Sequence, residues 1–154
     1  MEKIGFGAAS LSGAGGGYGF GRSEAAQDLI DYAFELGIKY YDTAPIYGFG
    51  QSELELGKAI KNIREKVKII SKSGVSWHDT KRVNMTNDPE ITLKMFEESL
   101  RRLDTDFIDI YMIHWPDKKI DIRYPVEVLA NLQSQGKILD IGLCLSLIHI
   151  SEPT

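Results

Sequence analysis

Three short apolar runs in this sequence each end in an ionisable side chain or are followed at once by one. The carboxyl ends of parallel strands meet at one edge of a sheet or one mouth of a barrel. If the runs are strands of one parallel sheet, their polar ends would therefore lie together. The side chains in question are Asp42, Tyr47 (five residues after Asp42), Lys72 and His114.

These four residue types fit proton delivery to a carbonyl group that is being reduced. A tyrosine hydroxyl has an ordinary pKa near 10, which is too high for easy proton exchange at neutral pH. A lysine ammonium nearby favours the phenolate, and a carboxylate holds that lysine in place and charged. A neutral imidazole can donate to the carbonyl oxygen and orient it. Taken singly, each residue also has a structural explanation: a turn former, a solvated lysine, or a hydrogen-bonded core histidine.

Strands and helices alternate along the chain, which indicates a parallel sheet with crossover helices. Apolar runs predict strands over 4–9, 38–42, 67–71, 107–113 and 138–143. Apolar residues at three- and four-residue steps predict the helices. The first helix is predicted to begin at the cap Ser23, and the second at a capping box of Ser52 and Glu55. The third helix follows the cap Asp88 and begins with Pro89, and the fourth helix spans 125–135.

The spacing of the units leaves two α/β architectures open. Strand starts are about 33 residues apart, so eight units would need roughly 265 residues, the size of a (β/α)8 barrel. The chain has 154 residues, enough for about five strands and four helices. It is either a complete five-stranded doubly wound sheet or a little over half of a barrel. Length alone favours the complete sheet.

Composition and charge exclude several classes of protein. Hydrophobic residues make up 43% of the chain and charged residues 26%, as in ordinary globular proteins. The net charge of −4 gives no basic surface for nucleic acid or an anionic membrane. A single cysteine, Cys144, and three scattered histidines predict neither a disulfide framework nor a metal site. Without a signal peptide or a bilayer-length apolar run, we expect a soluble cytoplasmic protein.

The glycine-rich start offers a weaker alternative. The pattern Gly5-x-Gly7-x-x-Ser10 is similar to a dinucleotide-binding fingerprint but lacks the third glycine. The glycines between 13 and 21 lie too far from the helix start for a tight strand-to-helix turn. A Rossmann domain is therefore disfavoured.

Four long motifs in a fixed order carry a resemblance to one family. They are Gly37 to Ala59 with Asp42-Thr-Ala-Pro-Ile-Tyr47-Gly-Phe-Gly-Gln-Ser-Glu53, Ile69-Ile-Ser-Lys72, Ser99 to Asp117 with His114-Trp-Pro-Asp117, and Gly136 to Gly142. Together they resemble the aldo-keto reductase family, over Ile4 to about Cys144. The resemblance implies a partial TIM (β/α)8 barrel with about five parallel strands and four helices. It also implies NADPH, less often NADH, as hydride donor, and an aldehyde, ketone or sugar as the small-molecule carbonyl substrate.

The same resemblance assigns roles to individual positions. Tyr47 matches the family's proton donor, Lys72 the residue that tunes it, and Asp42 the carboxylate paired with that lysine. His114 matches the residue that orients the carbonyl, and Trp115 would help to wall the substrate cavity or would simply be a packing residue. Substrate contacts would come from Tyr47, His114 and Trp115, and cofactor contacts from Gly7, Ala8, Ala9 and Asp42.

The chain departs from the family pattern after Cys144. The family would continue with an asparagine and three more βα units, whereas Leu145 follows here. The last ten residues fit no barrel helix and resemble translated adapter sequence. We therefore expect the N-terminal part of a barrel over 1–144 and a non-native tail over 145–154, in which His149 has no functional weight. Five strands cannot close an eight-stranded ring, so the chain alone is expected to be weakly active or inactive.

Three readings of function follow. The parent protein is an NADPH-dependent carbonyl reductase, with this chain carrying its four catalytic residues. It could instead be a regulatory subunit of aldo-keto-reductase type that binds nicotinamide nucleotide and senses its redox state for a partner protein. The third reading is a small doubly wound domain with strand order 2-1-3-4-5, in which the polar strand ends are incidental. Substrate identity, NADPH versus NADH preference and oligomeric state are left open by the sequence.

Overall fold

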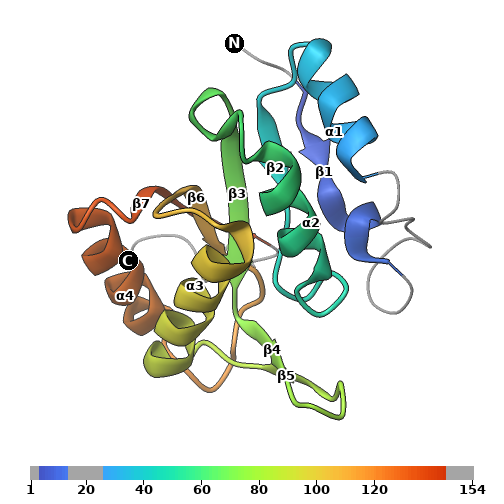
Figure 1. Cartoon of the computed structure of the whole chain (residues 1–154). Helices are drawn as coiled ribbons and strands as arrows, with labels where there is room; N and C mark the ends of the chain where they lie inside the picture. The colour runs from blue at the N-terminus through green and yellow to red at the C-terminus, as the bar shows by residue number, and fades with distance from the viewer. Residues whose placement is uncertain (1–3, 14–25, 145–154) are drawn as a thin grey trace.

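The computed structural model describes residues 4–13 and 26–144, which form one curved parallel sheet with helices packed along it (Figure 1). The five strands of this sheet are β1 (Phe6–Gly7), β2 (Tyr40–Asp42), β3 (Lys68–Ser73), β6 (Ile108–Ile113) and β7 (Ile138–Leu143). The four α-helices are α1 (Ala26–Glu35), α2 (Gln51–Ile60), α3 (Pro89–Leu103) and α4 (Arg123–Ser134). Two short 3₁₀ helices, η1 (Ala8–Ser12) and η3 (Arg64–Lys66), complete the connections.

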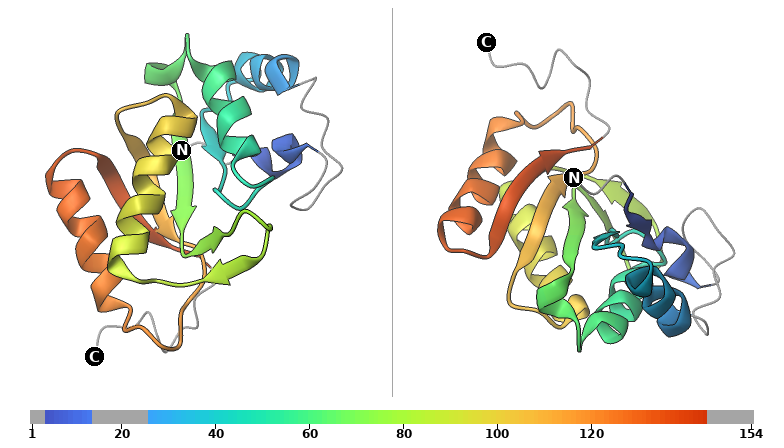
Figure 2. Two further views of the ribbon diagram at one scale, coloured as in Figure 1. Left: turned by 60° about the horizontal axis from the view of Figure 1, so that its bottom comes forward. Right: turned by 90° about the horizontal axis from the view of Figure 1, so that it is seen from above.

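The strand order decides between the two architectures. The sheet runs β1-β2-β3-β6-β7, so each parallel strand lies beside the next one along the chain. The order 2-1-3-4-5 of a doubly wound sheet is absent from the described residues. All four helices lie on the same side of the sheet and follow its curvature, each packed against the next (Figure 2). This arrangement is an arc of a (β/α) barrel, and it confirms the predicted partial barrel of five parallel strands and four helices.

One short hairpin was not expected from the sequence. Strands β4 (Val75–Trp77) and β5 (Val83–Met85) pair antiparallel directly after β3. Gly74, at φ +92°, makes the bend between β3 and β4. The hairpin thus extends from the carboxyl end of the sheet, beside the start of α3 (Figure 1).

Two predicted helix starts had different outcomes. Asp88 caps α3 as expected, because its side chain accepts the backbone N–H groups of Glu90 and Ile91. The capping box at the start of α2 was wrong: the cap is Gly50, and Ser52 lies inside the helix. The predicted cap Ser23 and the predicted tail 145–154 lie outside the described residues.

The core lies between the sheet and the helices. Its largest fully buried side chains include Tyr41, Ile69 and Tyr111 from the strands and Leu56, Phe96 and Leu129 from the helices. Phe96 meets Tyr111 edge to face, with ring centroids 5.1 Å apart.

The arc is open at both ends within the described part of the chain. Strands β1 and β7 each have a sheet neighbour on one side only. On α1, Ile30 and Ala33 are buried in the core, but Leu29, Tyr32 and Leu36 are 45%, 62% and 63% exposed. Leu29 and Leu36 lie at three- and four-residue steps from the buried Ala26, Ile30 and Ala33, a spacing that would place them on the same face of the helix. They are exposed because α2 is the only described helix that packs on α1.

No described helix combines the length and the apolarity needed to cross a lipid bilayer.

Candidate active site

Three of the four predicted side chains lie together at the carboxyl end of the sheet because their strands are neighbours. Asp42 is the last residue of β2, and Lys72 is near the end of the adjacent β3. His114 directly follows β6, and its backbone N–H donates to the Ser73 carbonyl of β3 at 3.0 Å. The parallel ladder therefore brings an acid, an amine and an imidazole to one edge.

Lys72 is held by a complete set of acceptors. Its Nζ lies 2.8 and 2.9 Å from the two carboxylate oxygens of Asp42 and 2.7 Å from the backbone carbonyl of Thr43. An ammonium group has three protons, so these three contacts use all of them. Lys72 is only 3% exposed. The result is a buried, charged lysine with a fixed position.

Tyr47 reaches the same place from the turn between β2 and α2. The Lys72 Nζ lies 5.3 Å from the centre of its ring, within range of a cation–π contact. The His114 ring stands edge-on to it, with centroids 6.1 Å apart. The structure thus places all four predicted catalytic residues, Asp42, Tyr47, Lys72 and His114, around one small space.

The turn that carries Tyr47 depends on glycine. Gly48, Phe49 and Gly50 have φ values of +63°, +54° and +94°, all in the left-handed region. A Cβ on Gly48 would overlap the carbonyl oxygen of Ser12 and lie 2.8 Å from its Cα. Because Gly48 has no side chain, the turn can pack against η1 and keep Tyr47 over the sheet edge.

His114 is uncharged at neutral pH. It is 7% exposed, and burial followed by the nearby Lys72 ammonium lowers its pKa from 6.5 to about 4. A neutral imidazole beside Tyr47 can donate a hydrogen bond to a carbonyl oxygen without delivering a proton itself.

The lowered pKa of His114 should make the folding stability depend on pH. Between pH 6.5 and pH 4 the unfolded chain binds a proton at this position and the folded chain does not, so stability falls as the pH falls. From this group we expect a loss of about 2 kcal/mol in the free energy of unfolding between pH 7 and pH 5. Urea unfolding at the two pH values measures it, and His114→Gln should lack this part of the loss. An equal pH dependence in the wild type and His114→Gln would contradict the prediction.

The residues predicted to contact a nicotinamide cofactor border the same edge. Gly7 ends β1 in register with Asp42, and a Cβ placed on Gly7 would meet no atom within 4 Å. Ala8 is fully buried and its carbonyl accepts the Ser52 hydroxyl, while Ala9 is partly exposed. The position of a Gly7 side chain is therefore not occupied by other described atoms. Residues that would hold the nucleotide phosphates were not predicted within this chain.

Trp115 lies next to the predicted catalytic group. It is 39% exposed, and its ring centroid is 5.9 Å from that of His114. Its backbone carbonyl accepts the side-chain amide of Asn87, which lies between the hairpin and α3. The structure thus places Trp115 beside His114 and partly open to solvent.

The sequence reasoning missed two residues of this site. Thr43 supplies the third acceptor for Lys72, and Ser52 binds the Thr43 hydroxyl at 2.8 Å. Both lie in the motif from Gly37 to Ala59. The available signal was that a hydroxyl residue directly follows Asp42 and a second one comes shortly after Tyr47. Within the part of the chain that the structure describes, no three His, Cys, Asp or Glu side chains are grouped to hold a metal ion.

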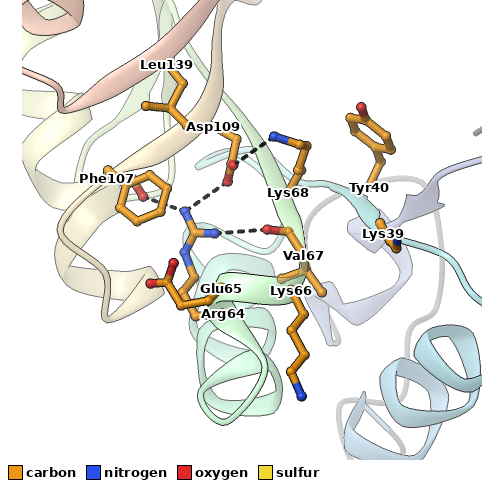
Figure 3. A pocket seen from close by; sticks show the side chains of 10 residues that line it. All are labelled: Lys39, Tyr40, Arg64, Glu65, Lys66, Val67, Lys68, Phe107, Asp109 and Leu139. Atoms are coloured by element: carbon orange, nitrogen blue, oxygen red, sulfur yellow. Dashed lines mark hydrogen bonds and ion pairs between the residues drawn. The ribbon is translucent and has the colours of Figure 1, made fainter. Parts of the chain in front are cut away.

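A cavity of about 550 Å³ lies elsewhere, at the amino ends of β2, β3, β6 and β7 (Figure 3). Arg64 crosses it and binds the Asp109 carboxylate and the Phe107 carbonyl, each at 2.9 Å, and the Val67 carbonyl at 3.2 Å. Its guanidinium also stacks on the Phe107 ring at 4.0 Å. These contacts hold η3 to the starts of the strands, which is a structural role.

Comparison with known proteins agrees with the resemblance in the sequence. The model of the Aldo/keto reductase family matches residues 3–151. "Aldo-keto reductase YhdN" of Bacillus subtilis is 39% identical over 144 residues, covering 92% of this chain and 43% of that protein. The "NADH-specific methylglyoxal reductase" of Escherichia coli is 35% identical over 166 residues, covering 99% of this chain and 51% of that protein.

Comparison with solved structures leads to the same family. The glycerol dehydrogenase AKR11B4 from Gluconobacter oxydans superposes with a TM-score of 0.83 at 32% identity, covering 95% of this chain and 45% of that one. This chain therefore spans about half the length of the proteins it matches. From the family match, the curated relatives and the shared half-barrel, the chain belongs to the aldo/keto reductase family.

Proposed function

We propose that the full-length protein, of which this chain forms a part, reduces the carbonyl group of an aldehyde, ketone or sugar with NADPH. NADH is an alternative donor, in keeping with the name of the Escherichia coli relative. One observation carries the proposal. The Lys72 ammonium, with all three protons hydrogen-bonded, lies over the Tyr47 ring and beside a neutral His114.

The proposed chemistry divides between cofactor and protein. The nicotinamide, when bound, supplies a hydride for the carbonyl carbon. Tyr47 gives the proton of its hydroxyl to the carbonyl oxygen. Lys72 stabilises the phenolate that remains, and Asp42 keeps Lys72 charged and in place. His114 donates a hydrogen bond to the same oxygen and so sets the direction of the carbonyl.

The proposed cofactor contacts follow from the same edge of the sheet. Gly7 and Asp42 would border the nicotinamide ring, with Ala8 and Ala9 forming the backbone beside it. Tyr47, His114 and Trp115 would face the substrate. A half-exposed indole next to the neutral imidazole favours carbonyl compounds with an apolar or aromatic part.

Turnover by the full-length protein tests this proposal. We expect loss of NADPH absorbance that depends on an added aldehyde or ketone, with one alcohol formed for each nucleotide oxidised. Nucleotide binding with no turnover of any carbonyl in a broad panel would favour the regulatory subunit instead. Failure to bind either nicotinamide nucleotide would contradict both.

A further inference from the structure

A chain of buried hydroxyl groups lies behind the Lys72 ammonium. The Thr43 Oγ1 and Ser52 Oγ atoms are 2.8 Å apart, and Ser52 Oγ donates to the Ala8 carbonyl at 2.7 Å. All three residues are 0% exposed. The chain connects the end of β2, the first turn of α2 and the start of η1 without access to water.

The direction of these hydrogen bonds follows from proton counting. A serine hydroxyl has one proton, and that of Ser52 goes to the Ala8 carbonyl. Thr43 must therefore donate to Ser52. This arrangement leaves the Thr43 side chain in a single rotamer, with its only proton used.

The Thr43 backbone is fixed from the other side as well. Its N–H donates to the Ile70 carbonyl of β3 at 2.8 Å, and its own carbonyl accepts from Lys72 Nζ at 2.7 Å. The contact with Lys72 is the shortest of the three that the ammonium makes. The orientation of Thr43, together with Asp42, thus helps to fix where the lysine charge lies.

Ser52 also contacts the residue that carries the phenol. Its backbone N–H donates to the Tyr47 carbonyl at 3.2 Å. One serine therefore binds the Tyr47 backbone through its amide and the Thr43 side chain through its hydroxyl. The distance between Tyr47 and Lys72 depends on both contacts.

We propose that Ser52 is a positioning residue that, through Thr43, holds the Lys72 ammonium over Tyr47. This inference rests on the proposed function, because it concerns the same proton donor. Without the Ser52 hydroxyl, the Thr43 hydroxyl and the Ala8 carbonyl lose their partners in a dry environment. Thr43 then turns toward another partner, its carbonyl leaves Lys72, and the phenolate of Tyr47 loses part of its stabilisation.

The titration of Tyr47 in the full-length protein tests the inference. Tyrosine labelled with ¹³C at Cζ reports the phenol pKa by NMR, and Tyr47→Phe identifies the signal. Lys72→Met, which removes the charge, defines the full effect of the lysine. We expect Ser52→Ala and Thr43→Val each to raise the Tyr47 pKa by about 0.5 or more, a part of the Lys72→Met effect.

Two matched variants separate positioning from general stability. Thr43→Ser keeps the hydroxyl and should leave the Tyr47 pKa within about 0.2 of the wild-type value. Lys58→Ala lies on the exposed side of α2, where the lysine side chain is 68% exposed, and should do the same. Thr43→Val is nearly isosteric, so it decides the question if Ser52→Ala does not fold.

The possible failures are distinguishable. If Lys72→Met raises the Tyr47 pKa but Ser52→Ala and Thr43→Val do not, the inference is wrong and the proposed function stands. If Lys72→Met has no effect, the inference is also wrong, because it acts through that lysine. Carbonyl reduction by the full-length protein, measured alongside, shows whether the proposed function fails with it.

Discussion

Tyr47→Phe is expected to lower the rate of carbonyl reduction by the full-length protein by about 10²- to 10⁴-fold, the usual contribution of a proton donor. Phenylalanine has the same ring, so it keeps the contacts with the Lys72 ammonium at 5.3 Å and with His114 at 6.1 Å. Only the hydroxyl is lost. The fall should therefore appear in kcat, with nucleotide affinity and thermal stability close to those of the wild type.

Steady-state kinetics with a reactive aldehyde measure the effect, and fluorescence titration measures nucleotide binding. Tyr40→Phe is a matched control, because Tyr40 starts the strand that Asp42 ends and lines the cavity crossed by Arg64. It should leave kcat unchanged. If Tyr47→Phe kept a rate within twofold of the wild type, the proton would have to come from another group, and the proposed role of Tyr47 would be wrong.

Much of the fold could be predicted because its long elements have strong local signals. Strand β7 spans Ile138–Leu143 as predicted, and α3 begins at the predicted Asp88-Pro89 cap. The β4–β5 hairpin could not be predicted, because each strand has three residues and no alternation long enough to recognise. Its pairing of Val75 with Met85 is visible only in three dimensions.

The candidate site was predictable where it depends on strand ends. Asp42, Lys72 and His114 converge because parallel neighbours end at one edge, which sequence periodicity already implies. Tyr47 follows Asp42 by five residues and was singled out with it, but the left-handed turn at Gly48 and Gly50 that carries Tyr47 was not predicted.

Ser52 shows why the remaining residues were missed. The pattern of Ser52 followed three residues later by Glu55 satisfies the local rule for a capping box. In the structure, the Thr43 hydroxyl and the Ala8 carbonyl compete successfully for the serine side chain, and Gly50 becomes the cap. Glu55 binds Gln51 and Lys58 on its own helix instead. Long-range partners of this kind leave no periodic trace in the sequence.

The residue after Ser52 joins three elements through a buried charge. Glu53 is 0% exposed, and its two carboxylate oxygens accept from the Ser71 hydroxyl and the Arg102 Nε, each at 2.6 Å. These contacts tie α2 to β3 and to α3. Ser71 precedes Lys72, and a Cβ on Gly50 would lie 2.8 Å from the Arg102 Cδ, so Arg102 also packs under the Tyr47 turn.

Arg102→Met should therefore lower the free energy of unfolding by about 3–5 kcal/mol, the usual cost of leaving a buried charge without its partner. Methionine replaces most of the apolar stem, so the loss reflects the guanidinium rather than a large cavity. Urea unfolding at neutral pH measures the change. Adding Glu53→Gln should recover part of the stability, because the second substitution removes the charge that the first leaves unpaired.

An exposed ion pair of the same helices supplies the control. Lys61 and Asp104 lie 3.0 Å apart just beyond the ends of α2 and α3, with their side chains 70% and 67% exposed. Water already solvates both charges, so Lys61→Met should change the free energy of unfolding by no more than about 1 kcal/mol. Equal losses for Arg102→Met and Lys61→Met would mean that burial adds nothing to the Glu53 contact. The support that this carboxylate gives to the Lys72 strand and the Tyr47 turn would then have to come from packing alone.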